Sequence, residues 1–432
     1  MRIERREWDG AGAGAVAAEI RAARPQPEEV AGAVAGIVAE VARRGDAALR
    51  ELTRSLDGVE QPPDSVRVEP GEIAAAPQAV EPRVVEAMQV AAGNIRALAE
   101  AELRARSPVD VDLSEGQRVR QLDAPVGSAG AYAPGGRAAY PSTVLMCCVP
   151  ARVAGVDRVV VASPPGPDGS VHDAVLTACS VAGVDEVYAV GGAQAIAALA
   201  LGTASVAPVD IVVGPGNRYV VEAKRMLSDR VGVDSIAGPS ELVVVADRSA
   251  DPRLLALDLC AQAEHGPDGL LVAASADRGL LDELDSVLAE FASDRPSVAD
   301  VPVILVAAPS PGAALLLADE LAPEHLELQL ADASEEVVKE RVAGCVFVGP
   351  GGGTAFGDYA AGSNHVLPTG GAARFGRPLG PSTFLRRTSI VEIDAAAAAA
   401  LAPTVDALAR AEGFSVHGES AKARAGQNGG EP

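Results

Sequence analysis

The chain of 432 residues is poor in aromatic side chains (3%) and in basic ones, with 36 Lys and Arg against 59 Asp and Glu. The resulting formal charge of −23 opposes binding to nucleic acid or to an anionic membrane, because both require a basic face. No stretch reaches the ~18 uninterrupted apolar residues of a transmembrane helix, and Met1 to Trp8 is charged rather than apolar. We therefore expect a cytoplasmic protein with no nucleic-acid and no membrane partner.

Cysteine is also scarce, and its pattern excludes the common cysteine sites. The five residues are odd in number and scattered, and they lack the paired CxxC spacing of zinc knuckles and redox centres. Each is therefore expected to be a small core residue. They are Cys147, Cys148, Cys179, Cys260 and Cys345.

The apolar residues that are present predict an α/β fold. Residues 25–102 show helical spacing, whereas from Arg118 onward short Val-rich runs alternate with Ala-rich helical stretches. Continuous apolar strands between helices indicate parallel sheets covered by helices on both faces. The expected strands are residues 158–162, 186–190, 211–213, 242–245, 270–273 and 303–306.

The number of strand and helix units predicts two such sheets, with boundaries near Gly127 and Gly238. A small C-terminal appendage is expected to contain a helix that begins after Asp394, as its N-cap, and stops at Pro403. The final residues, 426–432, are expected to be disordered.

Four of the five histidines lie in short motifs that carry acids or amides, which suggests a site, since imidazole both ligates metals and transfers protons near neutral pH. Residues 251–264 are expected to form one helix, which places Gln262 and His265 on one face near its end. They could share a cation, although a polar helix end is an equally good interpretation. Asp358 follows a Gly-rich stretch, and His417 lies far along the chain. Two nitrogens and two oxygens suit Zn(II), with Mn(II) or Co(II) as surrogates.

Glu324 and His325 are adjacent at an expected junction between a helix and a strand, where an acid and an imidazole can serve two proton transfers. His325 and Glu327 would lie on one side of that strand and Glu324 on the other. Taken alone, however, this motif favours three solvated residues at the exposed start of a strand.

Three glycine-rich turns could approach a nucleotide. Residues 10–15 satisfy GxGxxA, but the charged segment before them cannot be the buried strand that a dinucleotide fingerprint requires, so we reject them. Residues 211–217 are better placed, since a strand runs into Gly214-Pro215-Gly216-Asn217 and then into a helix. Residues 191–194 repeat this geometry. A tight connection without a ligand is the rival interpretation of both turns.

With these motifs together, the chain strongly resembles the histidinol dehydrogenase family over nearly its whole length. Single motifs are weak, but their ordered set is specific. It comprises residues 44–49, 132–136, 141–146, 191–197, 214–217 and 238–241, followed by the four histidine motifs.

The resemblance implies the site residues. Zn(II), one per subunit, would be bound by Gln262, His265 and Asp358, with His417 supplied by the partner subunit of a homodimer that shares its active sites. Glu324 and His325 would be the proton acceptors. NAD would contact Tyr132, Gln194 and Asn217. Ser240 and Glu412 would help to hold the substrate, together with His325 and the four metal ligands.

The resemblance also implies the architecture, which is α/β with two incomplete Rossmann-like domains, parallel sheets covered by helices, and small helical terminal arms. Residues 1–24 would form the N-terminal arm. The catalytic metal domain would combine residues 25–127, which include the helical part, with residues 239–378. Residues 128–238 would bind NAD, and residues 379–432 would form the arm that reaches the partner subunit.

The implied reaction is the four-electron oxidation of L-histidinol through a retained aldehyde to L-histidine, with NAD as co-substrate. An NAD-dependent dehydrogenase of another small alcohol, such as a sulfonated diol, is the first alternative. A zinc hydrolase in which Glu324 activates water is the second. A non-catalytic metal-binding protein is disfavoured by the acid-base pair beside a complete ligand set.

Overall fold

The computed structural model describes residues 1–24, 29–60, 62, 65–135 and 139–426. The chain forms two compact units. The first contains Met1–Ala101 and Gly127–Phe384, and the second contains Glu102–Val126 and Leu385–Pro432. The expected disorder after Gly426 concerns residues outside the described part of the chain.

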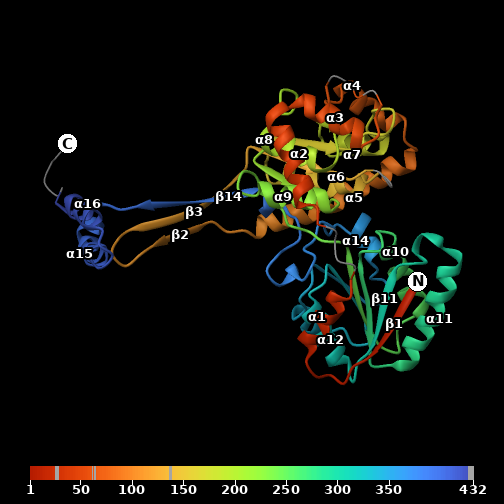
Figure 1. Cartoon of the computed structure of the whole chain (residues 1–432). Coiled ribbons are helices and arrows are strands. Elements are labelled where there is room, and N and C mark those ends of the chain that lie inside the picture. The colour runs from red at the N-terminus through yellow and green to blue at the C-terminus, as the bar shows by residue number, and fades with distance from the viewer. Residues whose placement is uncertain (25–28, 61, 63–64, 136–138, 427–432) are drawn as a thin grey trace. The chain divides into compact units, whose positions relative to one another are not determined.

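Sheet A, in the first unit, is a parallel sheet of six strands in the order β1-β11-β10-β9-β12-β13. Alternate residues of β9 point to opposite faces. Val243 and Val245 pack with α1 and α12, whereas Leu242 and Val244 pack with α10 and α11, so helices cover both faces (Figure 1). The strands are β1 (Arg2–Glu7), β9 (Glu241–Ala246), β10 (Leu270–Ser275), β11 (Pro302–Ala307), β12 (His325–Gln329) and β13 (Cys345–Val348). The helices around them are α1 (Ala13–Ala22), α10 (Pro252–Ala263), α11 (Arg278–Asp294), α12 (Pro311–Leu321), α13 (Glu335–Lys339) and α14 (Thr354–Tyr359).

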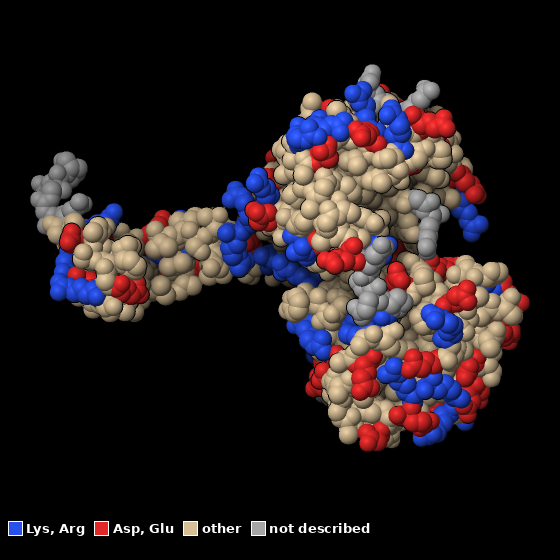
Figure 2. All heavy atoms as spheres, in the orientation of Figure 1, with Lys and Arg blue, Asp and Glu red and all other residues tan. Residues whose placement is uncertain are grey.

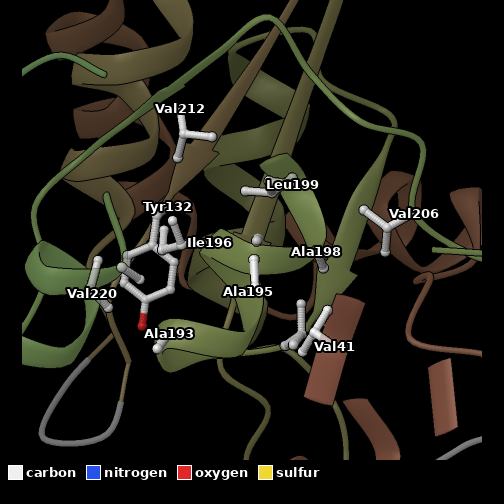
Figure 3. Close-up of a cluster of buried hydrophobic side chains, with 14 of the residues drawn as sticks. Val41, Tyr132, Ala193, Ala195, Ile196, Ala198, Leu199, Val206, Val212 and Val220 are labelled. Carbon is white, nitrogen blue, oxygen red and sulfur yellow. The ribbon is translucent and has the colours of Figure 1, made fainter. Parts of the chain in front are cut away.

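Sheet B, also in the first unit, has five parallel strands in the order β6-β5-β4-β7-β8. Its strands are β4 (Ser128–Tyr132), β5 (Arg158–Ser163), β6 (Val187–Ala189), β7 (Ile211–Val213) and β8 (Gly232–Val233). The later helices of this part are α6 (Pro141–Val153), α7 (Asp173–Val181), α8 (Gly192–Leu201) and α9 (Arg218–Leu227). Figure 3 shows the core beside α8, where small Ala side chains allow Ile196 and Leu199 to pack closely against Val212.

The N-terminal helices pack with sheet B. Val34 and Val41 of α2 and Leu49 of α3 belong to the same buried cluster as Ile196 and Leu199. Residues 25–127 were expected to accompany residues 239–378, whereas the apolar face of α2 packs on α8 and α9. These helices are α2 (Ala31–Arg44), α3 (Asp46–Leu56), α4 (Pro70–Ala75) and α5 (Pro82–Ala105).

The second unit contains an antiparallel sheet and a helical hairpin. The sheet has the order β14-β3-β2, and α15 packs on α16. The strands are β2 (Val109–Asp112), β3 (Arg118–Pro125) and β14 (Leu385–Glu392), and the helices are α15 (Ala395–Ala411) and α16 (Ser415–Ala425). This sheet was not expected from the sequence, because its strands are polar and mostly exposed.

The expected fold class, α/β with two parallel sheets covered by helices, is confirmed. Asp394 is the N-cap of α15, since its Oδ1 accepts a hydrogen bond from the Ala397 amide at 2.8 Å. The expected stop at Pro403 is wrong, because the helix continues to Ala411 with the proline inside it. A proline removes one hydrogen bond but can remain in a helix when packing on a neighbour compensates, and here α16 is that neighbour.

The charged N-terminal segment is a strand, β1, but it lies at the edge of sheet A and none of its residues is buried. It therefore is not the central buried strand of a dinucleotide fingerprint, in keeping with the rejection of residues 10–15. Four cysteines are buried as expected, and Cys345 is partly buried. Within the described ranges, no helix is both long and apolar enough to cross a membrane.

Acidic and basic side chains are interspersed on the face of the first unit seen in Figure 2, with no continuous basic surface there. This distribution agrees with the acidic composition of the whole sequence.

Candidate active site

The expected acid-base residues lie at the start of β12, at the amino-terminal edge of sheet A. His325 pairs in register with Leu242 of β9 and Cys345 of β13. Leu326 and Leu328 point to the face covered by α1 and α12, so His325 points to the face covered by α10. The carboxyl-terminal end of α10 and the short α14 reach the same edge (Figure 1).

The expectation that Glu324, His325 and Glu327 are solvated is wrong. Their exposed fractions are 6%, 3% and 0%. Because β12 is an interior strand between β9 and β13, its polar residues are covered by neighbouring strands and by α10 rather than by water. Burial of three ionisable groups in one short segment is unusual and is typical of a functional site.

The two ring nitrogens of His325 have different partners. Nδ1 lies 3.3 Å from the Glu241 carbonyl oxygen, which can only accept a hydrogen bond, so Nδ1 carries the proton. Nε2 is then the basic nitrogen, and it lies 3.6 Å from Oδ1 of Asp358. Burial lowers the pKa of His325 to about 3, so the ring is neutral at physiological pH. His325 therefore directs an unprotonated nitrogen toward Asp358.

Glu324 is held beside His325 from the other side of the strand. Its Oε2 accepts a hydrogen bond from the Glu241 amide at 2.8 Å and lies 3.7 Å from His325 Nδ1. Burial raises the pKa of Glu324 well above its usual range, and a hydrogen bond from Ser240 opposes this shift. A carboxylate with a raised pKa is a stronger base than an ordinary glutamate, which suits proton transfer. Ser240, expected at the substrate site, thus contacts the acid-base pair.

Asp358 lies in α14 and is partly buried. Burial raises its pKa to about 6. His365 fixes its backbone, because His365 Nδ1 donates to the Asp358 carbonyl at 2.9 Å, while Nε2 lies 3.3 Å from the Thr143 hydroxyl. Both nitrogens of His365 are used in these contacts, and burial lowers the pKa of the ring to about 4. These contacts pack His365 between the backbone of α14 and the Thr143 side chain.

Gln262 lies in the last turn of α10, which begins at the N-cap Asp251 as expected. Its side chain is 3% exposed, and neither its Oε1 nor its Nε2 has a hydrogen-bond partner among the described residues. A buried amide without partners costs free energy unless a ligand satisfies it. His265 follows the helix end and is exposed, yet nearby atoms desolvate its ring and lower its pKa. A neutral imidazole and an unpartnered amide oxygen are donors that suit Zn(II).

The side chains of the described residues that could bind a metal ion are not gathered into one cluster of charged or sulfur ligands. Within the described part of the chain, no three His, Cys, Asp or Glu side chains gather closely enough to hold a metal ion. His417 and Glu412, both expected at the site, lie in the second unit and are exposed. The His417 ring contacts Phe414, with ring centroids 5.5 Å apart.

The expected cofactor residues lie at the carboxyl-terminal edge of sheet B. Tyr132 is buried at the end of β4, and its hydroxyl accepts a hydrogen bond from the Gly192 amide at 3.0 Å (Figure 3). Gln194, in the first turn of α8, is 1% exposed, and its Oε1 is without a partner among the described residues. Asn217 caps α9 by accepting from the amides of Tyr219 and Val220. These three residues flank two glycine turns at one sheet edge, where nucleotides bind in folds of this kind.

Two further acidic residues, which belong to none of the sequence motifs, lie near the expected site residues. Asp57 follows α3, and Gln194 Nε2 donates to its Oδ2 at 3.3 Å. Burial raises the pKa of Asp57 to about 6. No local motif marks this residue, because its partner Gln194 lies more than a hundred positions away. Asp258 could have been found, since it precedes Gln262 by four residues and so shares a face of α10.

Fold and site together define an α/β enzyme with a buried acid-base pair at the edge of one parallel sheet and glycine turns at the edge of another. The sequence profile described as histidinol dehydrogenase matches residues 21–425. The chain is 45% identical over 397 residues to a histidinol dehydrogenase of Synechococcus sp., covering 90% of each chain. It is 43% identical over 422 residues to one of Ruegeria pomeroyi, covering 95% of each.

A solved structure agrees with these sequence relatives. The crystal structure of histidinol dehydrogenase from Elizabethkingia anophelis matches with a TM-score of 0.89 at 28% identity, covering 98% of this chain and 97% of that one. The chain therefore belongs to the histidinol dehydrogenase family, and the expected class of enzyme, a dehydrogenase, is confirmed.

Proposed function

We propose that this enzyme oxidises L-histidinol to L-histidine in two steps through L-histidinal, using Zn(II) and NAD, as the last two steps of histidine biosynthesis. Family membership supports the reaction class. The single observation that carries the assignment is the position of the buried His325. Its basic Nε2 faces Asp358 at the amino-terminal edge of sheet A, where the Gln262 side-chain amide has no partner among the described residues. We place the enzyme in the cytoplasm.

Gln262, His265 and Asp358 of one subunit would bind one Zn(II), with His417 of the partner subunit as the fourth ligand. The bound zinc would hold the imidazole and amino nitrogens of the substrate and thereby position its carbinol carbon. Support comes from the donor chemistry, since a neutral imidazole, an amide oxygen and a carboxylate are donors that zinc accepts. The unpartnered atoms of Gln262 also support it, because a ligand would satisfy them.

His325 would take the hydroxyl proton in the first oxidation. Its low pKa keeps the ring unprotonated, and the Glu241 carbonyl holds the tautomer in which Nε2 is free to accept. Glu324 would activate the water that hydrates the aldehyde before the second oxidation. The amide of Glu241 and the hydroxyl of Ser240 orient its carboxylate for that role. Each such transfer typically accelerates a step ~10²–10⁴-fold.

NAD would accept the electrons while contacting Tyr132, Gln194 and Asn217. The Tyr132 hydroxyl and the Gly192 amide lie together at the start of α8, and an α-helix start favours negative charge. Residues 128–238 would thus form the NAD-binding domain. The metal domain would be built mainly from residues 239–378, and residues 379–432 would form the arm of the partner subunit.

A homodimer with shared active sites would supply the missing ligand. Large apolar side chains are exposed on α15, on α16 and in the turn between them. The exposed fractions of Leu408, Phe414 and Val416 are 60%, 55% and 70%. Such a surface is costly in water and favours contact with another chain. Glu412 and His417 lie on this same segment and would reach the substrate and the metal of the partner subunit.

The test is a count of NADH formed per L-histidinol consumed by the purified zinc-loaded enzyme, with the His325→Gln variant as the inactive control. Two equivalents support the proposal. One equivalent indicates a simple alcohol dehydrogenase, and turnover of a sulfonated diol in place of L-histidinol favours the related substrate. Hydrolysis of an ester or amide without NAD would indicate the zinc hydrolase instead.

A further inference from the structure

Two acids outside the proposed catalytic set, the buried Glu327 and the partly buried Asp258, meet beneath the site. Glu327 lies on β12, two residues after His325 and on the same face, and its exposed fraction is 0%. Asp258 lies on α10, one turn before Gln262, and its carboxyl group is hydrogen-bonded to that of Glu327. Hence the two acids join α10, whose last turn contains Gln262 and which ends just before His265, to the strand that begins at His325.

No cation neutralises these acids, since no ion pair joins either carboxyl group to a Lys or Arg among the described residues. Oε1 of Glu327 accepts a hydrogen bond from the Thr354 amide at 3.1 Å. Its Oε2 is buried, and the side chains beside the Glu327 carboxyl group are those of Asp258 and Gln329. A buried carboxyl group and a partly buried one in contact repel each other when both are ionised, which favours one proton between them.

A third element is tied to the same pair. Thr354 is the first residue of α14, the helix that carries Asp358. The preceding residue, Gly353, is packed so closely on Asp258 that an added Cβ would lie 2.9 Å from Oδ1. Gln329, two residues beyond Glu327, donates to the Gly352 carbonyl at 3.2 Å. The acids therefore touch α10, β12 and the start of α14, which are the three elements that carry Gln262, His265, His325 and Asp358.

We propose that Asp258 and Glu327 are a positioning pair in which one shared proton fastens α10 to β12 and, through the Thr354 amide, to α14. The pair thereby sets the separation between the metal-binding side chains and His325. What the pair positions rests on the proposed function, whereas the shared proton itself does not. Neither acid touches the substrate or the reacting atoms in this account.

Infrared difference spectroscopy of the zinc-loaded, full-length enzyme tests the shared proton directly. At pH 7, the spectrum of the wild type minus that of Glu327→Gln should contain the carbonyl band of a protonated carboxylic acid, and the band should shift in D2O. Glu324→Gln is the matched control, because it removes a different buried acid and should leave the Glu327 band in place. Absence of the band from the Glu327→Gln difference would overturn the shared proton.

Zinc affinity, measured by competition with a chromogenic chelator, tests the positioning role. Glu327→Gln keeps a donor toward Asp258 and an acceptor for Thr354, so its zinc affinity should stay within about threefold of the wild type. Glu327→Leu removes both and should lose zinc affinity by about tenfold or more. Equal affinities of the Leu variant and the wild type, or equal losses in the Gln and Leu variants, would contradict the proposal.

If Glu327→Leu fails to fold, the double variant Asp258→Leu with Glu327→Leu keeps the test available, because two apolar residues leave no unpaired buried carboxyl. It should fold and still bind zinc about tenfold more weakly, since the Thr354 amide has lost its acceptor. Wild-type zinc affinity in the folded double variant would overturn the positioning role. If the enzyme fails to oxidise L-histidinol, the proposed function fails, while the infrared band and the zinc affinities still decide this inference.

Discussion

The protonation of His325 is set by its surroundings rather than by imidazole chemistry alone. Burial disfavours the charged ring, and the Glu241 carbonyl selects the tautomer with the proton on Nδ1. Burial keeps the His325 ring unprotonated and so able to accept a proton. It also couples protein stability to pH, because the ring is not buried in the unfolded chain and its pKa there is not lowered.

We expect this coupling to be measurable in the metal-free protein. The pKa of His325 is lowered to about 3, whereas it is about 6.5 in the unfolded chain. The unfolded state therefore binds the proton first, and stability is lost as pH falls below the unfolded value. Between pH 7 and pH 5, His325 should remove about 2 kcal/mol of unfolding free energy. Urea unfolding of the wild type and of His325→Gln at both pH values checks this, and equal pH dependence would contradict it.

Gln262 offers a second test at the level of one side chain. Gln262→Met keeps the volume but removes two polar atoms that lack partners, so the metal-free protein should gain about 1 kcal/mol of unfolding free energy. The same substitution should strongly weaken zinc binding, because it removes a proposed ligand.

Gln329→Met is the matched control for that variant. Gln329 is also buried, but its Nε2 donates to the Gly352 carbonyl. This substitution should therefore destabilise the protein by about 1 kcal/mol, since the carbonyl loses its donor. Denaturant unfolding measures both variants, and a loss of stability in metal-free Gln262→Met would show that its amide is satisfied without a ligand.

At the scale of elements, the turn between β7 and α9 depends on a glycine. Gly214 has φ +108°, and a Cβ placed there would lie 2.3 Å from the carbonyl oxygen of Tyr132. A buried ion pair fixes the same turn, because Asp234 accepts from the Gly214 amide at 2.8 Å and lies 2.7 Å from Lys224 Nζ. The turn thus holds Tyr132 and Asn217 at one sheet edge.

Gly214→Ala should therefore cost about 1–3 kcal/mol of unfolding free energy and weaken NAD binding. Gly183→Ala is the control, since Gly183 also has a positive φ (71°) but has no atom within 4 Å of an added Cβ. The control should cost about 1 kcal/mol and leave NAD binding unchanged. Thermal unfolding and NAD titration of both variants test this, and equal NAD affinities would remove the turn from the cofactor site.

The sequence predicted the apolar strands well and the polar strands poorly. Strands such as β5, β7 and β10 are continuous apolar runs, and the sequence located them closely. β1 was missed because it is charged and pairs with β11 some three hundred residues away. The strands of the sheet β14-β3-β2 were missed because they are polar and mostly exposed. The helix α15 passes through Pro403 because packing on α16 outweighs a local helix breaker.

The residues of the candidate site could be predicted from the sequence, but their burial could not. The histidine motifs and the family resemblance named Glu324, His325 and Gln262. Their burial could not be read locally, because it follows from the interior position of β12 in sheet A. Asp57 has no local sequence signature, because its partner Gln194 is brought close only by folding. Asp258, in contrast, shares a face of α10 with Gln262 and could have been found from its spacing.

At the scale of the whole molecule, the proposed active site needs two subunits. His417→Ala in one chain and His325→Gln in the other should each be inactive as homodimers. When the two variants are unfolded and refolded together, mixed dimers should regain activity, because one of their two sites has a complete set of residues. If the chains pair at random, about half of the dimers are mixed, and each mixed dimer has one intact site out of two. We therefore expect about a quarter of the wild-type activity. No regained activity would contradict the exchange of His417.

The central claim is that residues distant in the chain converge on one zinc ion within reach of Glu324 and His325. Zinc anomalous diffraction from crystals grown with the metal tests it most directly. The account predicts one peak per subunit, bound by Gln262, His265 and Asp358 and by His417 of the partner subunit. A peak that lacks these ligands, or a complete site formed within one chain, would contradict it.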